Sequence, residues 1–318
     1  MDKKLWILIF IWLLLVVISL NLGAFKLNLS QIIYEEYAQN VFFNIRMPRI
    51  LLASLSGGIL GISGLTLQAL FKNPLVGPKI IGVSTSSALG GALAILFGFS
   101  GIFLVLNAFV FGILALLLLF LLAKFIQNSN IFSLILCGIL INGFAGALIA
   151  LIEFLADDEE KLPNIIFWML GSFSVASWEK LEILIIFSII PLVLLFLMRY
   201  HLNLLSLSDN DLKGLGINFK FSRKLILILT TILIASQVSV CGNIAYVGLV
   251  VPHMSRFLGS ANHQKILPYC FFLGMIFMLA CDDFARIISS AELPLGILTA
   301  LIGTPFFIYL LKRNFNAN

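Results

Sequence analysis

Long uncharged stretches of apolar residues alternate with short polar segments along the 318-residue chain. Most of these stretches approach the ~20 residues that an α-helix needs to cross a bilayer core of ~30 Å. The pattern predicts an all-α, polytopic membrane protein with about ten transmembrane helices. The predicted spans are residues 5–24, 47–71, 80–97, 102–123, 132–155, 181–198, 225–241, 244–258, 267–288 and 293–311.

Residues 46–91 form the most informative stretch, because its first apolar run is unusual for a helix that faces lipid. The run contains small residues and a polar amide, namely Gly57, Gly61, Gly64 and Gln68. Small residues let helix backbones approach closely in a membrane. Asn73-Pro74 ends the run, since proline does not continue a helix. A second run with many small residues follows, so the pair is predicted to form a helix hairpin that faces protein or water.

Two other apolar segments need a decision. Residues 162–178 are apolar enough for a span, but Trp168, Trp178 and a Gly-Ser break favour an interfacial helix followed by a loop. The first run follows Lys3-Lys4 and is too long for a signal peptide, and no clear cleavage site follows it. We therefore interpret it as a retained first span.

Composition and charge agree with a membrane protein. The chain is 61% hydrophobic and 11% charged, and its mean hydropathy is +1.10, which excludes an ordinary soluble domain. Ten spans place both termini on one side. If that side is cytoplasmic, 14 of the 20 Lys and Arg residues lie inside and 6 outside, as the positive-inside rule expects. The net charge of +5 therefore does not indicate binding to nucleic acid.

The sequence contains no recognisable catalytic constellation. It has no phosphate-binding loop, so this chain does not itself hydrolyse ATP through a P-loop. Its four cysteines lie in apolar runs without a metal-binding or disulfide spacing. Asp282, Asp283 and Arg286 stand near the end of a predicted span, where i,i+3 and i,i+4 neighbours can form a local salt bridge. An ion-driven secondary transporter would need more ionisable groups within the spans.

The polar segment 204–220 predicts a short helix. Ser208 and Asp211 form a capping-box-like start, and Gly216 is a plausible stop. Such a helix is either an ordinary surface element or a coupling helix that binds a partner. The whole chain is predicted to form one domain, residues 1–318. The corresponding positions of Pro74 and Pro252 suggest internal duplication, in which the region of spans two to five corresponds to the region of spans seven to ten.

Four blocks of sequence resemble the permease family of type II ABC importers for iron-siderophore, haem and vitamin B12. They occur in the family's order and cover nearly the whole chain. They are RMPR…GISGLTLQALFKNPLVGP…GVS (46–84), WMLGSFSVASW (168–178), GNIAYVGLVVPHMSRFLG (242–259) and DDFARIISSAELPLGILTALIGTPFFIYLL (282–311). The resemblance implies a dimer of ten-span subunits, with a cytoplasmic ATPase beneath each copy and an external binding protein that delivers the cargo.

The resemblance also assigns roles to individual residues. In the family, arginines at the motif positions of Arg46, Arg49 and Arg286 receive acidic residues of the binding protein. Membrane anchoring would also explain Arg46 and Arg49, and a local salt bridge would also explain Arg286. The cytoplasmic gate, or a plain structural turn, is formed by Asn73, Pro74 and Leu75. The ATPase is contacted by Asp209, Leu212, Leu215 and Gly216, where relatives have alanine in place of Leu212. Helix packing and the pathway involve Gly57, Gly61, Gly64, Gln68 and Asn142.

These inferences predict the permease subunit of a binding-protein-dependent ABC importer in the bacterial inner membrane, with both termini cytoplasmic and no cofactor, metal site or enzymatic activity of its own. The expected cargo is a ferric siderophore or haem. Cobalamin import by the same mechanism is the alternative, and ion-driven secondary transport is the alternative of a different class. The expected partners are an ATPase, a periplasmic or surface-anchored binding protein, a second identical or different permease, and membrane lipid.

Overall fold

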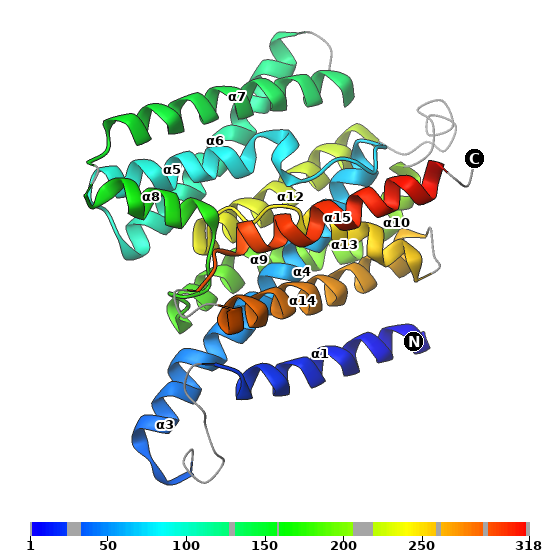
Figure 1. Ribbon diagram of the computed structural model, residues 1–318. Coiled ribbons are helices and arrows are strands. Elements are labelled where there is room, and N and C mark those ends of the chain that lie inside the picture. The colour runs from blue at the N-terminus through cyan, green and yellow to red at the C-terminus, as the bar shows by residue number, and fades with distance from the viewer. Residues whose placement is uncertain are drawn as a thin grey trace.

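The computed structural model describes residues 2–23, 33–126, 131–157, 159–205, 219–258, 262–288 and 292–315. These residues are helical or lie in the connections between helices, and no strand occurs among them. Figure 1 shows most of the long helices lying roughly side by side in one bundle. The predicted all-α class is confirmed.

The elements follow the predicted spans in order. They are α1 (Lys3–Asn21), α3 (Glu36–Asn40), the π-helix η1 (Val41–Arg46), α4 (Met47–Leu70), the 3-10 helix η2 (Pro78–Ile81), α5 (Val83–Leu96), α6 (Gly101–Phe125), α7 (Ile131–Leu155), α8 (Lys161–Leu170), α9 (Trp178–Leu197), α10 (Arg199–Leu205), α12 (Phe219–Cys241), α13 (Val247–Phe257), α14 (His263–Ile288) and α15 (Leu295–Phe315).

Each of the ten predicted spans corresponds to a helix. Within the described residues, six helices are long and apolar enough by themselves to cross a membrane: α1, the continuous helix Glu36–Leu70, α6, α7, α9 and Lys220–Cys241. The predicted interfacial segment contains the short helix α8, which ends at Leu170 and is followed by Gly171, a residue with φ of 74°. Helix α13 has only 11 residues and contains Pro252. Because a helix rises about 1.5 Å per residue, this predicted span is too short to cross a bilayer as a straight helix.

Helix α4 lies at the centre of the bundle (Figure 1). Its residues are almost all buried, because it packs against α14, α12, α13 and α9. The outer helices show the opposite pattern. Large apolar side chains on α1, α7 and α9 are mostly exposed, with Phe10 66%, Phe154 84% and Ile186 66% accessible. Such surfaces are expected where a helix faces lipid tails in place of water.

Helix α1 is tied to α14 near both of its ends. At the beginning, the Tyr269 hydroxyl donates a hydrogen bond to Asp2, which holds the pKa of that carboxyl group below its usual range. At the end of α1, the Ser19 hydroxyl donates to Asp283 Oδ2 over 2.5 Å. These polar contacts fix a helix whose other side chains are largely exposed.

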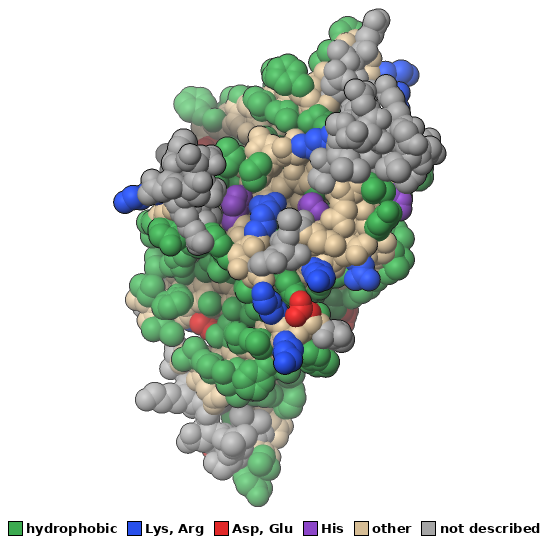
Figure 2. Space-filling view, turned by 90° about the vertical axis from the view of Figure 1, so that its right-hand side faces the viewer, with side chains coloured by type: hydrophobic (Ala, Val, Ile, Leu, Met, Phe, Trp, Pro, Cys, Tyr) green, Lys and Arg blue, Asp and Glu red, His purple; other side chains and the backbone are tan. Residues whose placement is uncertain are grey.

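Both chain termini lie at the same end of the bundle in Figure 1, as an even number of spans requires. Figure 2 shows the molecule from this end, and Lys, Arg and His side chains gather in the middle of the face. The positive-inside rule therefore favours the cytoplasmic side for this face, and the placement of both termini there stays a prediction.

Candidate transport site

Glycines on α4 lie where neighbouring backbones approach most closely. A Cβ atom on Gly57 would lie 2.1 Å from the carbonyl oxygen of Gly274 on α14. On Gly64 it would lie 1.7 Å from the Gly248 oxygen on α13, and on Gly61 2.7 Å from an α14 carbonyl oxygen. No side chain fits at these distances, so the glycines allow α4, α13 and α14 to pack backbone against backbone.

The end of the bundle away from the chain termini is called the outer end (Figure 1). At the outer end of α4, Arg49 lies between two acidic residues. Its Nη2 and Nε atoms bind Asp282 over 2.8 and 3.0 Å, in the bidentate geometry typical of an arginine–carboxylate pair. Its Nη1 atom donates to Glu292 Oε1 over 2.8 Å. The Arg49 side chain is 9% exposed and that of Asp282 is fully buried. Arg49 therefore joins α4 to α14 and to the connection before α15.

Arg286 extends this group into an outer ion cluster, which consists of Arg49, Arg286, Asp282, Asp283 and Glu292. Arg286 pairs with Asp282 over 3.3 Å and also with Asp283, so the predicted local salt bridge is confirmed. Its Nη1 atom donates to the carbonyl oxygen of Leu22, after α1, over 3.2 Å. The cluster thus connects the outer ends of α1, α4, α14 and α15.

Arg46 lies one turn before Arg49 and is also buried. Its Nη1 atom donates to the carbonyl oxygen of Leu20 over 2.5 Å. All three arginines predicted to dock a binding protein are therefore close together and have partners within the chain. Their docking role stays a prediction, and an external carboxylate would compete with Asp282 and Glu292 for Arg49.

The opposite end of α4 leads into the predicted gate. The Asn73 side chain accepts a hydrogen bond from the backbone N–H of Leu75 over 2.9 Å, which forms a local turn. Lys72 precedes it with a left-handed φ of 50°. The Leu75 side chain is 54% exposed. The structure thus presents an apolar side chain on a firmly hydrogen-bonded turn.

Two predicted polar residues each contact a neighbouring helix. Gln68 accepts a hydrogen bond from Arg256 Nη2 on α13 over 2.7 Å. Asn142 on α7 accepts a hydrogen bond from the Thr85 hydroxyl on α5. Both contacts occur between helices that pack within one chain. Asp209, Leu212, Leu215 and Gly216, the predicted ATPase contact, lie outside the described residues.

Comparison with known proteins decides the family. The model of the FecCD transport family matches residues 10–313. The chain belongs to the FecCD transport family. It is therefore the permease subunit of an ABC importer, a multi-pass membrane protein that is not itself an enzyme. Permeases of this family form dimers and work with an ATPase and a substrate-binding protein.

Individual relatives extend over nearly the same length. The molybdate import system permease protein MolB of Haemophilus influenzae is 45% identical over 317 residues, which cover 93% of this FecCD permease and 92% of MolB. The hemin transport system permease protein HmuU of Yersinia pestis is 34% identical, with 96% and 94% covered. A solved chain described as an inward-facing metal-chelate type ABC transporter has a TM-score of 0.92 at 42% identity, with 98% and 99% covered.

Sequence reasoning missed several contacts of the FecCD permease. It did not connect Arg49 with Asp282 and Glu292, since no local spacing relates residues so far apart. It also missed the hydrogen bond that Trp178 Nε1 donates to the Phe43 carbonyl over 2.9 Å. The unusual density of small residues did signal the close helix contacts, although it did not reveal that their partners are Gly248 and Gly274.

Proposed function

We propose that this permease imports a small metal oxyanion of the molybdate class across the bacterial inner membrane. The observation that carries this proposal is the 45% identity to MolB over 93% of the chain. Import of a ferric siderophore or haem is the second candidate. It is supported by 39% identity over 86% of the chain to a Helicobacter pylori protein named as an iron chelatin permease, and by the similarity to HmuU. Cobalamin is the third candidate, because the 35% identity to BtuC of Klebsiella pneumoniae is below the 39% identity to the iron chelatin permease.

The proposed assembly is a homodimer with the transport pathway between the two copies. The ATPase binds the end that carries the termini and the basic face of Figure 2, and both termini are cytoplasmic. The periplasmic or surface-anchored binding protein docks at the opposite end, near Arg46, Arg49 and Arg286. Each copy forms one domain over residues 1–318, embedded in membrane lipid.

Uptake by a deletion strain tests the cargo. Loss of the permease is expected to abolish high-affinity uptake of molybdate and to leave growth on siderophores and haem unchanged. Re-expression should restore uptake. Normal molybdate uptake together with failure to use one iron chelate would replace the first candidate with the second.

The gate proposal predicts leak through a truncated turn. Leu75→Ala removes apolar volume from an exposed position without removing the hydrogen bond between its backbone N–H and Asn73. We expect roughly 4- to 12-fold more cargo leak or uncoupled ATP hydrolysis in proteoliposomes, since burying about half of a leucine side chain contributes about 0.8–1.5 kcal/mol. Leu75→Met is the matched control. Equal leak in the wild type and both variants would leave only a structural role for the turn.

The coupling proposal predicts a loss of ATPase binding. Leu215→Asp places a charge on the apolar side of the predicted coupling helix, and buried apolar positions of an interface are the most sensitive to such a change. The amount of ATPase that co-purifies should fall at least about tenfold, because a loss of only ~1.4 kcal/mol of binding free energy weakens a complex tenfold. Lys213→Ala is the control on the polar side. Wild-type transport and an undiminished complex in Leu215→Asp would exclude this segment from coupling.

A further inference from the structure

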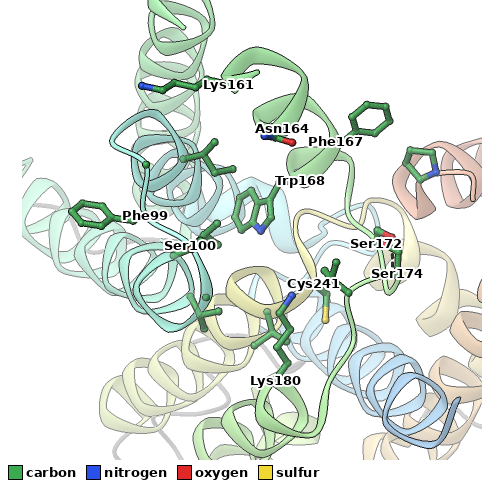
Figure 3. Close-up of a pocket in the computed structure, with 18 of the residues that line it drawn as sticks. Phe99, Ser100, Lys161, Asn164, Phe167, Trp168, Ser172, Ser174, Lys180 and Cys241 are labelled. Carbon is green, nitrogen blue, oxygen red and sulfur yellow. Dashed lines mark hydrogen bonds between the residues drawn. The ribbon is translucent and has the colours of Figure 1, made fainter. Parts of the chain in front are cut away.

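A cavity of about 1020 Å³ opens near the outer ends of several helices. It lies between the start of α6, helix α8 with the loop after it, the start of α9 and the end of α12 (Figure 3). Its lining combines hydrogen-bond donors with apolar side chains. The residues used in the argument below are Phe99, Lys161, Trp168, Ser172, Ser174 and Lys180.

Lys180 points into this cavity. In Figure 3 its side chain extends from α9 toward Cys241 and lies below Trp168. Its ammonium group makes no hydrogen bond or salt bridge within the part of the chain that the structure describes. Desolvating a charge without a partner is costly, so a half-buried ammonium group favours an anion beside it.

Further donors surround the same space. The indole nitrogen of Trp168 is turned toward Cys241 and Lys180 in Figure 3. The hydroxyl groups of Ser172 and Ser174, 2.9 Å apart, lie on the loop that closes the cavity. Since the Ser172 hydroxyl donates to the Ser174 oxygen, the Ser174 O–H is the free hydroxyl donor of the pair. An ammonium group, an indole N–H and this hydroxyl together offer several hydrogen bonds to the oxygen atoms of one anionic group.

The other charged side chains that line the cavity form no salt bridge with Lys180 in the described part of the chain. The Lys161 ammonium group donates to the carbonyl oxygen of Leu96 over 3.0 Å, and its side chain points away from Trp168 in Figure 3. Glu292 pairs with Arg49 over 2.8 Å, and Glu160 is exposed. Of the two lysines that line the cavity, Lys180 is therefore the one whose ammonium group is available to an anion.

The apolar rim indicates where the anion comes from. Phe99, Phe167 and Val175 are 49%, 64% and 64% exposed at the rim. They lie near the outer ends of the membrane-spanning helices α6 and α9, whose apolar side chains continue along the bundle. A free inorganic anion would not need this rim, and the cavity is far larger than one phosphate group. A phospholipid fits both the donors and the apolar rim, because its phosphate can accept hydrogen bonds in the cavity while its acyl chains pack against the apolar side chains of the helices.

We propose that this cavity binds the phosphate of a phospholipid from the leaflet at the outer end, with Lys180 as the principal contact. Trp168 and Ser174 complete the phosphate site, and Ser172 positions the Ser174 hydroxyl. The bound lipid would bridge α6, α8 and α9, none of which is joined to the others by a salt bridge among the described residues. The site is independent of the transported cargo, so it stands or falls separately from the proposed function.

Native mass spectrometry of the purified permease with added phosphatidylglycerol tests this proposal. Lys180→Gln is expected to lower lipid occupancy about tenfold, the change expected on losing a hydrogen bond to a charged group. Lys180→Arg should retain most of the occupancy. Lys161→Gln is the matched control, because Lys161 lines the same cavity with its ammonium group already engaged, and it should bind lipid as the wild type does. Equal occupancy in Lys180→Gln and the wild type would overturn the site.

Two further binding measurements test whether the phosphate group is recognised and whether it belongs to a lipid or to a free anion. Diacylglycerol, which lacks the phosphate, should bind the wild type and Lys180→Gln equally weakly. Millimolar inorganic phosphate should fail to displace phosphatidylglycerol. If the wild type bound diacylglycerol more strongly than Lys180→Gln does, Lys180 would not act through the phosphate. If inorganic phosphate displaced phosphatidylglycerol, the cavity would be a site for a free anion and not for a lipid.

Discussion

Replacing Arg49 with methionine will destabilise the permease by about 3–5 kcal/mol, the usual cost of breaking a buried ion pair by removing one partner. Asp282 is fully buried and would lose its bidentate partner, and Glu292 Oε1 would lose the same guanidinium group. Methionine keeps much of the apolar volume, so the loss reports mainly the charge. The midpoint of thermal unfolding in detergent or nanodiscs measures the effect.

A double-mutant cycle separates the ion pair from packing. Asp282→Asn alone should also destabilise, because it leaves Arg49 and Arg286 with fewer carboxylate partners. The combined Arg49→Met and Asp282→Asn variant should lose clearly less than the sum, since the two residues contact each other. Additive losses, or a fully stable Arg49→Met protein that no longer binds its binding protein, would instead support an outward docking role for Arg49.

Gly64→Ala will prevent normal packing of α4, with a loss of at least about 3 kcal/mol, the upper range for overpacking a core. The new Cβ would lie 1.7 Å from a backbone oxygen on α13, and backbone cannot move aside as a flexible side chain can. Expression level and thermal midpoint should both fall sharply.

Gly143→Ala is the matched control on α7. A Cβ there would meet nothing within 4 Å in the described chain. The change should be neutral or stabilise by up to about 1 kcal/mol, since alanine is the better helix former. A stable, dimeric Gly64→Ala protein would show that α4 and α13 can separate without cost, which would contradict the packing described above.

Hydrophobic pattern was sufficient to predict the helices but not their partners. Runs of apolar residues determine where a helix can span a membrane, so all ten predicted spans correspond to helices. The pattern did not predict the short helix α10, which lies between the predicted span 181–198 and the polar segment 204–220. The proposed duplication stays a prediction, since the contacts within one chain do not test it.

The outer ion cluster shows why the site was harder to predict. Asp282 and Arg286 are one helical turn apart, so their pairing follows from spacing alone. Arg49 lies 233 positions from Asp282, and no local rule connects them. Only the packing of α4 against α14 brings these side chains together. Sequence patterns predicted that the arginines matter, and the fold determines which acids they bind.

The π-helical segment η1 has a consequence for how the chain can vary in length. Here Met47 N–H donates to Phe42 five residues back, which accommodates one extra residue within the continuous helix Glu36–Leu70. Deleting one residue from Val41–Arg46 would allow an ordinary α-helix. Because each residue of the wider π-turn rotates the chain less than a residue of an α-helix does, the six residues of η1 turn it about as far as five α-helical residues would, and the segment before the deletion would keep its orientation relative to α4. A homologue one residue shorter here would therefore present the same face of its outer extension and lose only the local bulge.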